Sequence, residues 1–330
     1  MKTQTKITAL MLIMGLAVAV SSFASPLDGL QKQVDKFADS MAESLPMNST
    51  IGLNWSDAYI GQLISAPPHL GVGVFAGVTT FDMDIIDELA AAMGATVDLD
   101  LNKFPMPAFG GDLRIGGFFL PFDVGIKFGM LSDLDLGDIN INYMLVGGDI
   151  RYALLKGNAV LPKISIGVGV NYLKGGVGAT LNKGHRFEIG PDYIEVTDPS
   201  ANFEWETTTL DFKAQISKSF AIITPYLGLG VTHGWSKAGY EIESDILYNG
   251  YPMTDTQAKQ INNALSAQGV PTIDFDGSKG FSSIQSVNGW GFRAFGGFSI
   301  NIVVIKIDLS GMYNFLDGNY GGTLGIRFQL

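Results

Sequence analysis

The chain has no cysteine among its 330 residues and only three histidines. The absence of thiols excludes disulfides, zinc–cysteine sites and a lipid anchor on a modified cysteine. Charged residues make up 16% of the chain against roughly 25% in an average protein, and aromatic residues make up 11%, which excludes a disordered chain. The net charge of −11 argues against nucleic-acid binding, so we expect no nucleic-acid partner.

Long apolar runs are scarce as well, and the clearest one lies at the N-terminus. Lys2 and Lys6 precede an apolar run at residues 7–20, and the small residue Ala24 follows at a cleavage position. This pattern predicts a secretory signal peptide over residues 1–24. No later run reaches the 18 apolar residues of a transmembrane helix, so we expect no helix to span a membrane.

The sequence is rich in glycine, with 42 residues, and in alternating segments. Residues 122–130 place apolar side chains on one face and Asp, Lys or Gly on the other. Such alternation predicts ten strands, at residues 70–81, 109–120, 121–131, 139–154, 162–174, 206–217, 224–236, 287–300, 303–315 and 320–330. Short connections alternate with mostly longer ones, which hold 20 of the 32 acidic residues. This asymmetry is typical of an outer-membrane barrel, with short periplasmic turns and longer outer loops.

The last predicted strand carries the most specific feature. Apolar residues stand at every second position up to the C-terminus: Leu324, Ile326, Phe328 and Leu330. On the signal peptide, the alternating segments and this strand, the chain resembles bacterial outer-membrane β-barrels over residues 69–330. Its glycine-rich, acidic composition is similar to that of spirochaete barrels. The resemblance implies an all-β, closed antiparallel transmembrane barrel of about ten strands, within a range of eight to twelve. It also implies that Leu324 to Leu330 act as the signal for a barrel-assembly machine.

Residues 25–68 form a separate N-terminal segment. Apolar residues at a spacing of three to four predict a helix over 27–45, with Pro46 as its stop. We expect this helix to enter or cap the barrel as a plug, in which case its deletion would raise conductance. A helix on the membrane surface, or one that binds another protein, are the alternatives. The plug residues are Leu30, Val34, Phe37 and Met41.

Two of the predicted outer loops carry helix signals, at residues 84–93 and after the capping box of Thr254 and Gln257. Acidic residues in the loops do not match an EF-hand, and no dinucleotide-binding motif follows a strand. We therefore expect no metal and no cofactor.

The inward faces of the predicted strands carry eight bases and five acids. Two interpretations are open: a salt-bridge lattice that fills a narrow lumen, or a polar solute path with a net positive wall. The predicted lumen-lining residues are Asp112, Arg114, Asp123, Lys127, Asp149, Arg151, Lys163, Asp211, Lys213, Arg293, Lys306, Asp308 and Arg327.

The function expected from these patterns is passive passage of small solutes across a bacterial outer membrane. The rival is a non-conducting structural or surface-interaction barrel that acts through its acidic outer loops. We expect no enzymatic activity and no catalytic residues, because none of the three histidines follows an aspartate at a spacing of two, as in ten-stranded surface proteases. The expected partners are outer-membrane lipid, the assembly machinery and a small solute, and the sequence does not give the oligomeric state.

Overall fold

The computed structural model describes residues 26–65, 68–82, 103–135, 139–180, 185–189, 192–252, 254, 256–257, 259 and 281–330. Residues 1–24, and with them the predicted signal peptide, lie outside the described part, as does the predicted loop helix at 84–93. The capping box is formed, because Thr254 N donates to Gln257 Oε1 at 2.9 Å and Gln257 N donates to Thr254 Oγ1 at 3.4 Å.

Ten antiparallel strands close into one barrel within the described residues, in the order β7, β5, β4, β3, β2, β1, β12, β11, β10, β8 and back to β7. Both the fold class and the predicted strand count are confirmed. The strands are β1 Leu70–Asp82, β2 Lys103–Gly116, β3 Phe122–Asp135, β4 Ile139–Lys156, β5 Lys163–Thr180, β7 Asp192–Ser217, β8 Ile223–Tyr248, β10 Phe281–Ile302, β11 Ile305–Asn314 and β12 Tyr320–Gln329. Two short strands, β6 His185–Ile189 and β9 Tyr251–Pro252, pair with the far ends of β7 and β8.

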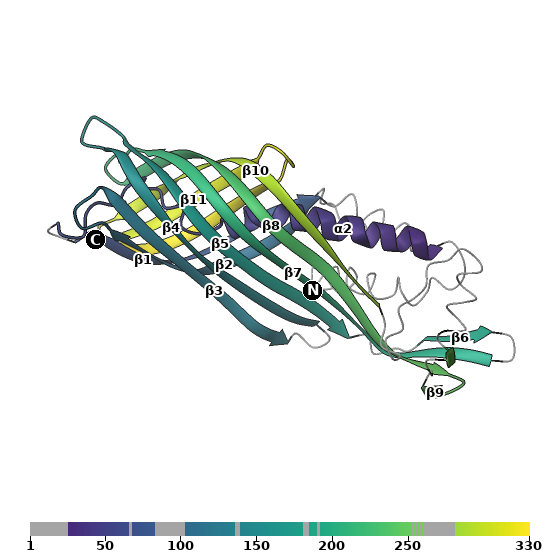
Figure 1. Cartoon of the computed structure of the whole chain (residues 1–330). Coiled ribbons are helices and arrows are strands. Elements are labelled where there is room, and N and C mark those ends of the chain that lie inside the picture. Colours follow the sequence, from purple (N-terminus) through teal and green to yellow (C-terminus); the bar gives the residue numbers. More distant parts are fainter. Residues whose placement is uncertain are drawn as a thin grey trace.

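The two ends of the barrel differ. Four turns, at residues 117–121, 157–162, 218–222 and 303–304, lie at one end, which we call the short-turn end. The C-terminus lies at this end too, and the opposite, long-loop end carries β6 and β9 (Figure 1).

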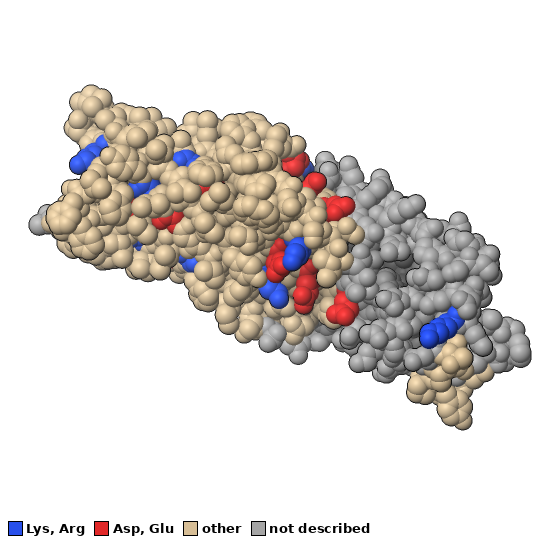
Figure 2. All heavy atoms as spheres, viewed as in Figure 1, with Lys and Arg blue, Asp and Glu red and all other residues tan. Residues whose placement is uncertain are grey.

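The outer face of the wall is apolar over a band of limited height. On β8, Leu227 and Leu229 are about half exposed, and the band ends at Trp235, which stands beside Trp290 of β10 in the aromatic cluster around His233. Nine residues of a tilted strand rise about 20 Å, close to the ~25 Å apolar band of such barrels. Figure 2 shows this wall as mostly uncharged, with scattered charged atoms toward the short-turn end and a cluster of acidic and basic atoms at the rim toward the long-loop end.

Three strands run far past this band, and here the predicted boundaries are wrong. The sequence pattern predicts loops at 175–205 and 237–286, but the structure continues β7 and β8 to 26 residues each and starts β10 at Phe281. On β7 and β8 the outward positions beyond the apolar band include Glu204, Lys237 and Glu241, so the alternation of apolar and polar residues fades while the backbone hydrogen bonding continues. Trp235 of β8 pairs with Thr208 of β7. We call residues 192–207 of β7 and 236–248 of β8, together with β6 and β9, the outer extension.

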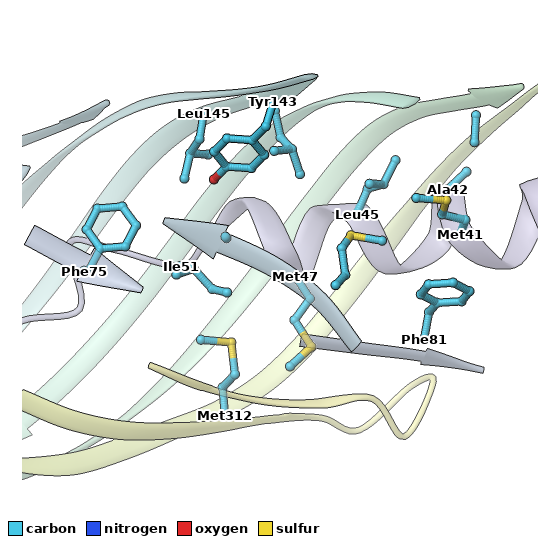
Figure 3. Close-up of a cluster of buried hydrophobic side chains, with 14 of the residues drawn as sticks. Met41, Ala42, Leu45, Met47, Ile51, Phe75, Phe81, Tyr143, Leu145 and Met312 are labelled. Atoms are coloured by element: carbon cyan, nitrogen blue, oxygen red, sulfur yellow. The ribbon is translucent and has the colours of Figure 1, made fainter. Parts of the chain in front are cut away.

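One helix, α2 Pro26–Ser49, runs into the barrel from the long-loop end (Figure 1). Its inner half buries Ala38, Met41, Ala42 and Leu45 against β1, β2 and the long strands (Figure 3). The predicted stop at Pro46 is wrong by one turn, because the helix ends at Ser49. Within the described residues, no helix has both the length and the hydropathy to cross a membrane.

Candidate functional site

Residues 50–60, which we call the strap, follow α2 and cross the barrel lumen from end to end. At the long-loop end, Asn48 Nδ2 donates to Thr79 Oγ1 at 2.7 Å, near the end of β1. At the short-turn end, Ile60 N donates to Asp123 Oδ2 at 3.2 Å, near the start of β3. The strap turns at Leu53, whose φ is +59°, and it stays buried along nearly its whole length.

Cationic side chains of the wall hold the carbonyl groups of the strap. Lys127 Nζ donates to Ile51 O, and to the O of Ser49 directly before the strap, each at 2.6 Å. Arg114 Nη2 donates to Leu53 O at 3.1 Å, and Arg151 Nη1 donates to Asp57 O at 2.9 Å. An extended segment makes no hydrogen bonds within its own backbone. These contacts therefore give hydrogen-bond partners to buried carbonyl groups that would otherwise have none.

Wall oxygens accept hydrogen bonds from the strap's N–H groups in the same way. Ala58 N donates to Ser217 Oγ at 2.9 Å, and Ser56 N donates to Asp308 Oδ1 at 3.4 Å. Leu53 N donates to Asp112 Oδ2 at 3.4 Å. The wall therefore complements the strap in both donors and acceptors, from β2 round to β11.

Trp55 is the largest side chain that the strap places in the lumen. Its Nε1 donates to Asp112 Oδ2 at 2.8 Å, and the guanidinium groups of Arg114 and Arg327 lie 5.7 and 4.7 Å from the ring centroid. Arginines over an indole face are favourable contacts, and stronger when desolvated. The ring fills the cross-section where Gly71 of β1 leaves room: a Cβ there would lie 2.8 Å from Trp55.

Beneath these contacts the wall charges interlock with one another. Arg114 bridges Asp123 at 2.5 Å and Asp149 at 2.7 Å, and Asp123 also accepts from Arg151 Nε at 2.8 Å. Further pairs join Lys213 to Asp149, Arg293 to Asp211 and Arg327 to Asp308. Of the two interpretations of the inward charges, this arrangement corresponds to the salt-bridge lattice that fills a narrow lumen.

The long-loop mouth holds the helix more loosely. Asn319 Nδ2 donates to Ser44 Oγ at 3.1 Å, and Ala38, Met41, Ala42 and Leu45 of the helix make apolar contacts here. Partial burial, with the nearby carboxylates of Asp39 and Asp317, raises the pKa of Glu43 above its usual range. Charge at the mouth therefore does not favour the inserted helix, whereas charge along the strap does.

The structure places all thirteen predicted lumen-lining residues on the inner wall. Eleven are buried, and the side chains of Lys163 and Lys306 are partly exposed at the short-turn end. Leu324, Ile326 and Phe328 lie on the outer face of β12. Of the predicted plug residues, Met41 is buried in the barrel, while the side chains of Leu30, Val34 and Phe37 lie outside the described part: Figure 3 shows Met41 among its apolar neighbours.

Sequence reasoning missed the strap itself. The apolar pattern of residues 25–68 predicted only the helix and indicated no role for Trp55 or Asp57. One signal was present: the predicted wall carried three more bases than acids. A narrow lumen with that surplus needs an acid from elsewhere, and Asp57 supplies it.

We expect Asp123→Ala to destabilise the barrel strongly. The change removes the only carboxylate paired with the buried Arg151 among the described ion pairs, and breaking such a pair costs about 3–5 kcal/mol. The temperature at which the folded, heat-modifiable gel band disappears should fall by many degrees. The control is Glu206→Gln, which breaks an exposed pair with Lys237 worth about 0–1 kcal/mol. Equal effects of the two changes would contradict the buried lattice.

Comparison with solved structures returns bacterial outer-membrane proteins. The translocator domain of the autotransporter NalP from Neisseria meningitidis is 10% identical, with a TM-score of 0.40, and the match covers 89% of this chain and 98% of that one. The outer membrane protease OmpT from Escherichia coli is 10% identical, with a TM-score of 0.40 and coverage of 80% and 97%. Ail, the attachment invasion locus protein of Yersinia pestis, is 13% identical, with a TM-score of 0.28 and coverage of 79% and 96%. The predicted resemblance to outer-membrane barrels is confirmed as a fold class.

The expectation that the chain is not an enzyme is contradicted by these comparisons. One of the matched barrels is a protease, so the class includes enzymes, and the absence of one protease motif did not justify a general exclusion. No protein of curated function matches the sequence. A family model described as Lsa36-like matches residues 69–330, the whole of the barrel, and the chain therefore belongs to the Lsa36-like family.

Proposed function

We propose that this protein is a plugged barrel of the bacterial outer membrane. The strap keeps the lumen closed, and small solutes pass only when the strap is displaced. The observation that carries the proposal is the continuous bonding of residues 50–60 to the wall by side chains of nine of the ten barrel strands.

Displacement of the strap does not require the barrel to open. The strap contributes no strand to the ladder, which closes through β7 with β8 and β1 with β12. The wall's contacts with it come from side chains, which can pair with one another or with water. A ten-stranded interior is narrow, so the path suits small solutes, and its surplus of bases favours anions.

A disulfide between strap and wall tests the proposal. Ser56 Oγ and Ser299 Oγ lie 2.8 Å apart, and the chain has no cysteine of its own, so Ser56→Cys with Ser299→Cys places a single thiol pair across this contact. We expect channel openings in planar bilayers only after reduction. The Ser56→Cys single variant is the control and should open equally with and without reductant.

Equal conductance of the oxidised and reduced double variant would contradict a displaceable strap. Silence in both states would favour a second candidate, a surface-interaction barrel. One observation supports that candidate: β8 continues from Trp235 to Tyr248 beyond the apolar band, with Lys237 and Glu241 exposed. The outer extension would then be the working part, and the plugged barrel its anchor.

A further inference from the structure

Asp57 of the strap lies at the short-turn end and pairs there with cations of three wall strands. It is 1% exposed. Lys163 Nζ donates to its Oδ1 at 2.9 Å, and Lys306 Nζ donates to its Oδ2. Arg327 Nη2 and Gln329 Nε2 approach Oδ2 at 3.4 and 3.3 Å. Strands β5, β11 and β12 thus converge on one carboxylate.

The cations around Asp57 differ in whether they also pair with a carboxylate of the wall. Arg327 also pairs with Asp308. In contrast, the described ion pairs of Lys163 and Lys306 are with Asp57 alone. Both lysines belong to the barrel, whereas their carboxylate belongs to a segment outside its ladder. Removal of the strap would therefore leave a preformed anion site with two unneutralised ammonium groups.

The geometry points to a carboxylate-binding site at the short-turn end of the lumen, which Asp57 occupies in the plugged state and a small carboxylate solute occupies when the strap moves. This inference rests on the proposed function and names its solute class. The donors are divided between two oxygens: Lys163 holds one, and Lys306, Arg327 and Gln329 surround the other. A planar two-oxygen group satisfies that division, whereas a single-centre anion such as chloride cannot reach both halves.

Formate rescue of Asp57→Gly in the full-length protein tests the site. The glycine variant removes the carboxylate and leaves space of its size, so sodium formate should raise the midpoint of thermal unfolding in a saturable way. Sodium chloride at equal concentration should not. Asp57→Asn is the matched control, because its amide fills the space without the charge. In this variant formate should raise the midpoint of thermal unfolding no more than chloride does. The wild type should behave like that control.

A midpoint of Asp57→Gly that is equal in formate and chloride would overturn the site, as would an equal formate effect in Asp57→Asn. If Asp57→Gly folds only when formate is present, the site is supported. If it folds in neither salt while Asp57→Asn folds, the site is rejected. The measurement needs no conductance, so a barrel that binds formate but never opens would reject the proposed function and retain the site.

Discussion

Replacing Gly234 by alanine is expected to push Pro46 aside, displace the strap that follows it, and open the barrel. A Cβ at this position of β8 would lie 2.2 Å from Pro46 Cγ, and the three nearest atoms all belong to Pro46. The added methyl group therefore meets the inserted segment first. Overpacking of this kind costs roughly 1–3 kcal/mol, which corresponds to about a 5- to 150-fold shift toward the displaced state. We expect single-channel recordings to show open events more often by a factor in that range.

The chain offers a matched control for this experiment. Gly289 of β10 is the direct cross-strand partner of Gly234, and among the described residues no atom other than those of its chain neighbours lies within 4 Å of the position of its Cβ. Gly289→Ala adds the same methyl group to the same rung of the barrel without touching Pro46, and conductance should stay at the wild-type level. If Gly289→Ala opens the barrel as readily as Gly234→Ala, contact with Pro46 is not the cause.

Two deletions are expected to differ sharply in conductance. Removal of residues 26–45 takes away α2 up to Leu45 but leaves its last turn and the strap, whose bonds to Lys127, Arg114 and Arg151 are made by residues after Ser49. Conductance should stay near the wild-type level. Removal of residues 26–60 also takes away Trp55 and Asp57 and should give a steadily open barrel. Comparable conductance in the two variants would show that the helix, and not the strap, closes the lumen.

The sequence-based prediction assigned the block to residues 27–45, whereas the structure adds a second inserted segment, the strap. The pattern of apolar residues located the helix well, because Met41 and Leu45 recur on one helical face and are buried together. It could not locate the strap, because an extended segment with polar partners has no periodicity of its own. Its binding groups are also far apart in sequence: Leu53 O is held by Arg114, 61 positions away.

The strands show the same division between local and non-local information. β3 and β12 could be predicted because one face of each strand lies against apolar surroundings and the other face lies against the charged lumen. Every second residue is therefore apolar. The far ends of β7 and β8 have water on the outside, and nothing in Glu204 or Glu241 distinguishes such a strand from a loop. Asp57 could be anticipated only from the charge surplus of the wall, which predicts an acid without saying where in the chain it lies.

The direction in which the strap threads the barrel has a practical consequence. The chain passes from α2 at the long-loop end to Leu70 at the short-turn end, and it finishes beside Leu70, where Leu330 N donates to Leu70 O at 2.9 Å. The two ends of the described chain therefore open onto opposite sides of the membrane. An affinity tag fused directly before Pro26 would be reached by antibody from the side of the long loops. The same tag after Leu330 would be reached only from the other compartment.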